Sequence, residues 1–104
     1  MTVISTTVMT IKPDRYEDFV ASVTKSKAIL EKYGAKSVRL MATMVGGGFG
    51  TFALATEYDD FAAAGAGLDK FMIDAEAVEV MQTSLGASGG TASADSSMWL
   101  EIPI

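Results

Sequence analysis

Residues 35–60, AKSVRLMATMVGGGFGTFALATEYDD, decide the fold of this chain. Two runs of alternating side chains, 35–45 and 49–58, flank three consecutive glycines. Alternation with a period of two predicts strands, and a short glycine-rich connection predicts that the two strands form an antiparallel hairpin. Asp59 and Asp60 follow as candidate N-caps, so the hairpin should lead directly into a helix.

The residues before the hairpin predict a strand and then a helix. Residues 2–11 alternate and are rich in β-branched side chains, which predicts a strand with both faces at least partly buried. Pro13 suits the first turn of a helix over about 13–33, and Gly34 suits the position just beyond its end. The apolar stripe of this helix consists of Tyr16, Phe19, Val20, Val23 and Leu30. Ile29 projects away from that stripe, which suggests a further contact surface.

The residues after the hairpin predict a second helical region and a last strand. Residues 60–85 carry apolar side chains at helical spacing with a second cap at Asp74, which predicts two short helices or one bent helix. Residues 87–96, ASGGTASADS, are small and polar and predict a mobile loop that could cover a ligand. Residues 98–104 predict the final strand, with Pro103 near its end.

The order of these elements predicts an α+β ferredoxin-like fold, β-α-β-β-α-β, with an antiparallel four-stranded sheet in one domain over 1–104. Helices can cover only one face of such a sheet. The first three strands are apolar on both sides, so the second face should pack against another copy of the chain. We therefore predict a homodimer, or a higher oligomer built from it.

Composition excludes several classes of partner. The net charge is −5, and no stretch combines Lys or Arg with aromatic residues, so we expect no nucleic-acid binding. The same charge disfavours anionic lipid, and no apolar run is long enough to span a membrane. The first residues lack the basic segment of a signal peptide, which predicts a cytoplasmic protein.

The chain contains no Cys and no His. Disulfides, thiol catalysis, His-dependent triads and His-ligated haem or zinc are therefore excluded. The aspartates at 59, 60, 69 and 74 do not match the spacing of a calcium loop and are better explained as caps and solvated positions. We expect no metal and no cofactor.

Three segments, IKPDRYEDF (11–19), MVGGGFGTFALATEYDD (44–60) and SSMWLEIP (96–103), resemble the dimeric α/β-barrel superfamily. Its NIPSNAP-like and antibiotic-biosynthesis-monooxygenase-like branches are the most similar. The resemblance implies a ferredoxin-like subunit that pairs sheet to sheet with a copy of itself. Members of the superfamily include cofactor-independent monooxygenases, isomerases and haem-degrading enzymes. The haem-binding members resemble this chain least, because it has no His to ligate iron.

Charged and hydroxyl-bearing residues near the predicted pocket are candidates for chemistry. Arg15 and Tyr16, at the start of the first helix, could anchor a ligand, or Tyr16 could pack in the stripe while Arg15 is solvated. Arg39 could pair with Glu57, either as the polar floor of a pocket or as a structural salt bridge. Glu57 and Tyr58 are the best candidates for a general base and a proton donor, the alternative being an ordinary charge at the end of a strand.

Aromatic residues could form the wall of the pocket. Trp99, the only tryptophan, could hold a planar substrate together with Phe49 and Phe52, or it could anchor the dimer interface. We thus predict a small homodimeric protein that binds an apolar small molecule in a pocket between sheet and helices. The alternative is a cofactor-independent monooxygenase or isomerase acting on an enolisable substrate, which could be aromatic. A one-residue change of register would move every strand residue to the other face.

Overall fold

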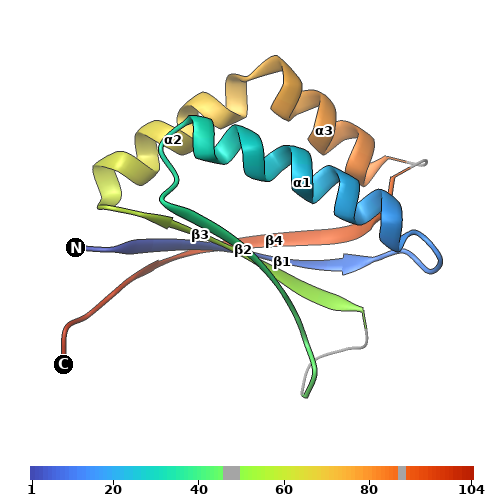
Figure 1. Cartoon of the computed structure of the whole chain (residues 1–104), viewed down its shortest axis with the longest axis horizontal. Helices are drawn as coiled ribbons and strands as arrows, with labels where there is room; N and C mark the ends of the chain where they lie inside the picture. The colour runs from blue at the N-terminus through green and yellow to red at the C-terminus, as the bar shows by residue number, and fades with distance from the viewer. Residues whose placement is uncertain (46–49, 87–88) are drawn as a thin grey trace.

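The structure, a computed structural model, describes residues 1–45, 50–86 and 89–104. Within these ranges, four strands and three helices follow one another in the predicted order: β1 (Val3–Ile11), α1 (Tyr16–Lys32), β2 (Ser37–Ala42), β3 (Thr51–Tyr58), α2 (Phe61–Ile73), α3 (Ala75–Leu85) and β4 (Thr91–Leu100). Figure 1 shows two layers, with the three helices on one side of the sheet and none of the described elements on the other.

The strands form one antiparallel sheet in the order β2-β3-β1-β4. The predicted α+β ferredoxin-like fold is confirmed by this topology. The subunit is a slab that measures 39 × 35 × 16 Å, so its uncovered sheet face is broad relative to its thickness. In Figure 1 the C-terminal segment and the far end of β2 and β3 both bend away from the helices, which makes the uncovered side concave.

The helix boundaries follow from local capping. Asp60 and Asp74 cap α2 and α3 as predicted, because their carboxylates accept hydrogen bonds from Ala63 N (2.7 Å) and Ala77 N (2.9 Å). The prediction that Pro13 opens the first helix was wrong: α1 begins at Tyr16. Asp14 adopts a φ of 61°, and this left-handed residue turns the chain before the helix can start.

The prediction of a mobile loop over 87–96 was also wrong for most of its length. Residues 91–96 belong to β4, which pairs with β1 along its length and ends at Leu100, not at 104. The side-chain hydroxyls of Thr10 on β1 and Ser93 on β4 form a hydrogen bond across the two strands, with their oxygens 2.6 Å apart. Small polar side chains can form this edge strand because its backbone bonds to β1 and its side chains need no apolar partner. Residues 87 and 88 lie outside the described part of the chain.

The core lies between the sheet and the helices. One cluster joins α1 to α2, α3 and β2; its buried members are Ile29, Leu30, Val38, Phe71 and Ala77. A second cluster at the end of β3 consists of Val3, Tyr58 and Ala64. Ile29 is 5% exposed, so the prediction that it marks a further contact surface was wrong. Ile29 lies outside the stripe of α1 that faces the sheet, and it is buried because α1 also packs against the neighbouring helices.

Strand alternation assigns each side chain to one face. Val3, Met9, Val38 and Tyr58 are buried beneath the helices, so residues in step with them face the helical layer. The residues between them lie on the side without helices, which we call the helix-free face. In the parts of the chain that the structure describes, no helix has the length and apolar character needed to cross a lipid bilayer.

Candidate functional site

A cavity of about 590 Å³ lies between the sheet and the three helices. Its floor is the helix-side face of β1, β3 and β4, and its walls come from all three helices. Its position follows from how the helices pack: α1 contacts β2, α2 contacts β3 and β1, and α3 contacts β4, and side chains do not fill the space between them. The volume falls within the range typical of small-molecule pockets.

The floor of the cavity is made of hydroxyl-bearing side chains. Ser5, Thr7 and Thr56 come from the central strands, and Ser96 comes from β4. The hydroxyls of Thr7 and Ser96 lie 3.0 Å apart, across the pairing of β1 with β4. A hydroxyl can donate as well as accept a hydrogen bond, so this floor can bind carbonyl, ether or alcohol groups.

The walls of the cavity are apolar. The largest wall side chains are Val23 and Leu30 from α1, Leu68 and Phe71 from α2, and Val80 and Met81 from α3. Two serines one helical turn apart, Ser22 and Ser26, add hydroxyls to the α1 wall. Among the lining residues that the structure describes, none is charged. The cavity therefore combines an apolar body with a few uncharged hydrogen-bonding groups.

The cavity opens toward the β4 edge of the sheet. Met72, Leu85 and Met98 line it and are also exposed to solvent. Past Thr91, β4 is exposed along its whole length, because the helices do not extend over this edge strand. Near the same side, Ser84 and Thr91 join α3 to β4 through hydroxyls 2.5 Å apart.

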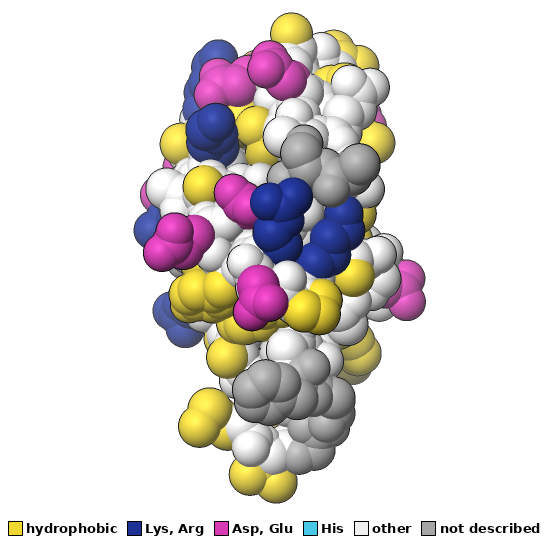
Figure 2. All heavy atoms as spheres, turned by 90° about the vertical axis from the view of Figure 1, so that its right-hand side faces the viewer, with side chains coloured by type: hydrophobic (Ala, Val, Ile, Leu, Met, Phe, Trp, Pro, Cys, Tyr) yellow, Lys and Arg dark blue, Asp and Glu magenta, His cyan; other side chains and the backbone are white. Residues whose placement is uncertain are grey.

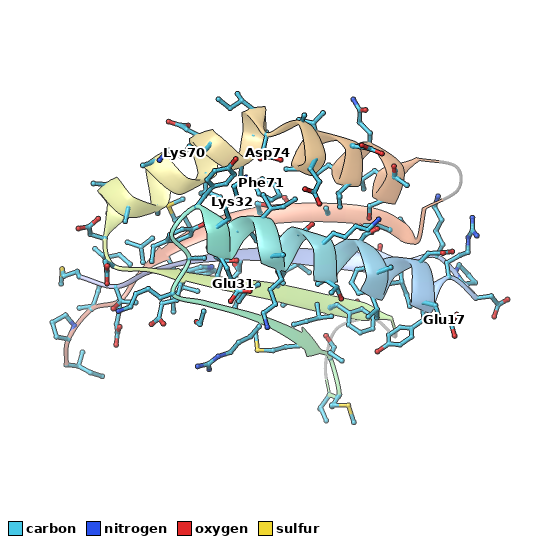
Figure 3. The ribbon with its side chains drawn as sticks, turned by 45° about the horizontal axis from the view of Figure 1, so that its top comes forward. Glu17, Glu31, Lys32, Lys70, Phe71 and Asp74 are labelled. Atoms are coloured by element: carbon cyan, nitrogen blue, oxygen red, sulfur yellow. The ribbon has the colours of Figure 1, made fainter. Side chains whose placement is uncertain are left out.

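A polar contact holds the helical layer together beside the cavity. The Tyr33 hydroxyl, at the end of α1, donates to Asp74 Oδ2 at the junction of α2 and α3, and Lys32 Nζ lies 4.0 Å from the same oxygen. Figure 3 shows Lys32 and Asp74 where the end of α1 meets this junction, close to Phe71. The hydrogen bond from Tyr33, together with that from the Ala77 amide, lowers the pKa of Asp74. The same bond raises the pKa of Tyr33.

The predicted residues Arg15, Tyr16 and Phe52 lie near the start of α1 and do not line the cavity. Arg15 forms an ion pair with Asp18 at 3.0 Å. Tyr16 and Phe19 both pack against Phe52, with ring centroids 6.0 and 5.0 Å apart. Phe52 thus joins α1 to the sheet. The predicted residue Phe49 lies outside the described residues.

Glu57 and Tyr58 point to opposite faces of the sheet because they are consecutive residues of β3. Glu57 lies on the helix-free face, where its carboxylate accepts a hydrogen bond from Ser37 Oγ at 3.3 Å. Tyr58 lies on the helix side and is 1% exposed, and its hydroxyl has no hydrogen-bond partner among the described residues. Burial raises the pKa of Tyr58. The structure does not bring the two groups to one substrate within a subunit.

Arg39 and Trp99 lie on the helix-free face, at opposite edges of the sheet. Arg39 is exposed, and within the described ranges it forms no ion pair with Glu57, contrary to the pair suggested by the sequence. Trp99 is 59% exposed and donates its Nε1 hydrogen to Thr6 Oγ1 at 2.7 Å. These residues are therefore placed on a surface, away from the cavity.

Reasoning from sequence missed the hydroxyls of the cavity. A signal for them was present: Ser5 and Thr7 are in step with the buried Val3 and Met9, and Ser26 lies within the apolar stripe of α1. Small hydroxyl residues at core-facing positions leave space unfilled, so they can mark a cavity.

No protein-family model matches the chain, and no curated protein matches its sequence. Solved structures do match its fold. One is a putative antibiotic biosynthesis monooxygenase from Bordetella bronchiseptica (13% identity, TM-score 0.71, covering 98% of each chain). Another is a NIPSNAP domain protein from Burkholderia xenovorans (14% identity, TM-score 0.70, covering 96% of this chain and 94% of that one). A third is a dimeric protein of ferredoxin-like fold from Bacteroides fragilis (14% identity, TM-score 0.57, covering 94% of each chain).

At these identities the likeness shows the fold alone. The structural neighbours are NIPSNAP-like and antibiotic-biosynthesis-monooxygenase-like proteins, the two branches to which the sequence segments pointed. The predicted resemblance is confirmed at the level of the ferredoxin-like fold.

Proposed function

We propose that the protein is a homodimer whose subunits each bind an uncharged, mainly apolar small molecule in the cavity between sheet and helices. The observation that carries this proposal is the composition of the cavity: about 590 Å³, apolar walls, a hydroxyl floor and no charged residue among the described lining. A carboxylate or ammonium in such a site would lose its hydration without gaining an opposite charge, which is strongly unfavourable. The ligand class is therefore a neutral molecule with oxygen groups along one side.

The homodimer is supported by the helix-free face. Ile4, Val8, Met41 and Trp99 lie on it, together with the small side chains of β3, and none of the described helices or strands covers them. Exposed apolar side chains also occur on the two segments that bend to the same side: Met44 and Val45 after β2, and Ile102 and Ile104 after β4. Figure 2 shows charged side chains mixed with hydrophobic ones over the upper part and the middle of the molecule, and hydrophobic but no charged side chains coloured in its lowest part. A second copy packed on this side would remove these groups from water.

Binding is favoured over catalysis by the separation of the candidate catalytic groups from the cavity. A monooxygenase or isomerase acting on an enolisable substrate needs a base to take the proton. Glu57, the candidate base, lies across the sheet from the cavity, and the described lining offers only hydroxyls and apolar groups. The ligand is therefore expected to be bound and released unchanged.

The binding proposal can be tested with two fluorescent probes that share one ring system. N-phenyl-1-naphthylamine is uncharged, and 8-anilino-1-naphthalenesulfonate adds a negative charge. The neutral probe should bind with its emission enhanced. The sulfonate should bind at least about tenfold more weakly, because its charge would lose hydration in an uncharged cavity. A tenfold difference in affinity corresponds to about 1.4 kcal/mol of binding free energy. Stronger binding of the sulfonate would contradict an uncharged site.

A matched pair of variants locates the probe. Ser26→Phe places a ring in the cavity from α1, whereas Ala28→Phe places it on the exposed side of the same helix. The first should weaken binding of the neutral probe at least about tenfold, and the second should leave it within about twofold. Equal effects of the two variants would show that the probe binds elsewhere.

The dimer can be tested by light scattering, which should give about twice the subunit mass of 10.9 kDa at micromolar concentration. Trp99 supplies a second measurement: its emission should shift to shorter wavelength as dilute monomer associates, because its ring becomes buried. A mass of one subunit at tens of micromolar protein would refute the dimer.

A further inference from the structure

The helix-free face carries opposite charges at its two edges and apolar or small side chains between them. From the β2 edge to the β4 edge, one row of side chains reads Arg39, Ala55, Thr6 and Ser97, and the next reads Met41, Ala53, Val8 and Asp95. Arg39 and Asp95 therefore occupy opposite edges of the face, in adjacent rows. The strand order fixes their separation within one subunit, because β3 and β1 lie between them.

Neither of these charges is neutralised by an ion pair among the residues that the structure describes. Both side chains are exposed, and the described ion pairs of the chain involve neither of them. The third charged residue of this face, Glu57, lies in an end row and has the Ser37 hydroxyl as its hydrogen-bond donor. Arg39 and Asp95 thus remain as a cation and an anion available to another molecule.

Two-fold symmetry limits how two such faces can meet. A two-fold axis between the sheets and parallel to the strands places β2 of each subunit over β4 of the other and keeps each row opposite itself. Arg39 then lies over the partner's Ser97, two residues along the same strand from the partner's Asp95. The offset is roughly 7 Å along the strand and about 10 Å between the sheets, so the backbone distance is about 12 Å, which the arginine and aspartate side chains can span together. The two-fold symmetry produces this contact between Arg39 and the partner's Asp95 twice in the dimer.

The other simple arrangement brings like charges together. A two-fold axis across the strands places β2 over the partner's β2. When that axis passes through the middle of the face, between the row of Arg39 and the row of Met41, each Arg39 lies one row from its own symmetry copy. Like charges set close together across an interface cost affinity and select against that arrangement. The charge pattern therefore favours the axis parallel to the strands.

We infer that the two subunits pack with β2 of one over β4 of the other, and that Arg39 pairs with the partner's Asp95 at both edges of the interface. This inference rests on the proposed homodimer and adds to it the orientation of the subunits and the residues that fix it. Trp99, which lies on the same strand as Asp95, is then enclosed beside the partner's β2 edge. The ion pairs close the two open edges of the apolar interface.

Charge reversal provides the test. Arg39→Glu, Asp95→Arg and the double variant are compared by sedimentation velocity over a range of protein concentrations. Each single variant should raise the dimer dissociation constant at least about tenfold, because both symmetric contacts become repulsive, and the double variant should return it to within about threefold of the original. Asp69→Arg, on the exposed side of α2, changes the net charge as much as Asp95→Arg does and should leave dissociation within about twofold.

The outcomes separate this inference from the proposed function. A chain that is monomeric without any substitution would refute the homodimer itself. A dimer that tolerates the single reversals, or that the double reversal does not restore, would overturn the pairing of Arg39 with Asp95 and leave the homodimer standing. Binding of the neutral probe, measured in parallel, should stay within about twofold in every variant, because the cavity lies on the other side of the sheet.

Discussion

Replacing Tyr58 by phenylalanine should stabilise the protein. The ring of Tyr58 fills the space between Val3 and Ala64 and is 1% exposed, so phenylalanine keeps the packing. The hydroxyl has no partner among the described residues, and an unsatisfied buried polar group costs about 1–3 kcal/mol. Taking the lower end, the free energy of unfolding should rise by about 1 kcal/mol. For an unfolding entropy of about 2.1 cal/mol/K per residue, this corresponds to a rise of about 5 °C in Tm.

Tyr33→Phe is the matched control, because it removes the same atom from a tyrosine whose hydroxyl donates to Asp74. This variant should be destabilised, so the same chemical change should have opposite signs at the two positions. Both can be measured by urea unfolding followed by circular dichroism, with an unchanged m-value confirming that the unfolding transition is the same. A Tyr58→Phe variant that lost stability, as Tyr33→Phe should, would refute the reasoning and indicate that the Tyr58 hydroxyl has a partner.

Three further substitutions test the helical layer, each by thermal unfolding. Gly65→Ala should stabilise α2 by roughly 0.5–1 kcal/mol, because a Cβ there meets nothing within 4 Å. Gly67→Ala should destabilise by about 1–3 kcal/mol, since its Cβ would lie 2.6 Å from the Tyr33 carbonyl oxygen and 3.0 Å from the Tyr58 ring; a gain in Tm would contradict the close packing. Asp74→Ala should lower Tm by removing the cap of α3 and the acceptor for Tyr33. The pKa of Asp74 is lowered by folding, so its contribution is complete above the unfolded pKa of about 3.9 and is lost as pH falls through the lower folded value. The difference in Tm between the original chain and Asp74→Ala should accordingly shrink below about pH 4, and a difference that did not depend on pH would argue against the ionised carboxylate.

The order and most of the boundaries of the elements could be predicted because the signals for them are local. Alternation marked β1, β2 and β3, and the carboxylates of Asp60 and Asp74 marked the starts of α2 and α3. The strand β4 could not be predicted over 91–96, because all its residues except Thr91 are Ala, Ser or Asp, which do not favour strands. They adopt extended structure through hydrogen bonds to β1, a segment far away in the sequence.

The candidate site shows a different limit. The sequence pointed to charged and aromatic residues, which are the usual carriers of chemistry, and the structure distributes them over two faces of the sheet and the start of α1. Glu57 and Tyr58 illustrate the reason: neighbours in a strand are separated by the sheet itself. The cavity is lined instead by serines and threonines, whose significance depends on what lies opposite them in space.

By itself, the sequence determined that this chain forms a ferredoxin-like subunit with apolar side chains on both faces of its sheet, because hydrophobic periodicity and capping are properties of short segments. Only the tertiary structure decided which face the helices cover and where a cavity remains. It also decided which charges, such as Arg39 and Asp95, stand unpaired at the edges. These features depend on strand register and on how three helices divide one sheet face between them, and both are set by contacts between residues distant in the chain.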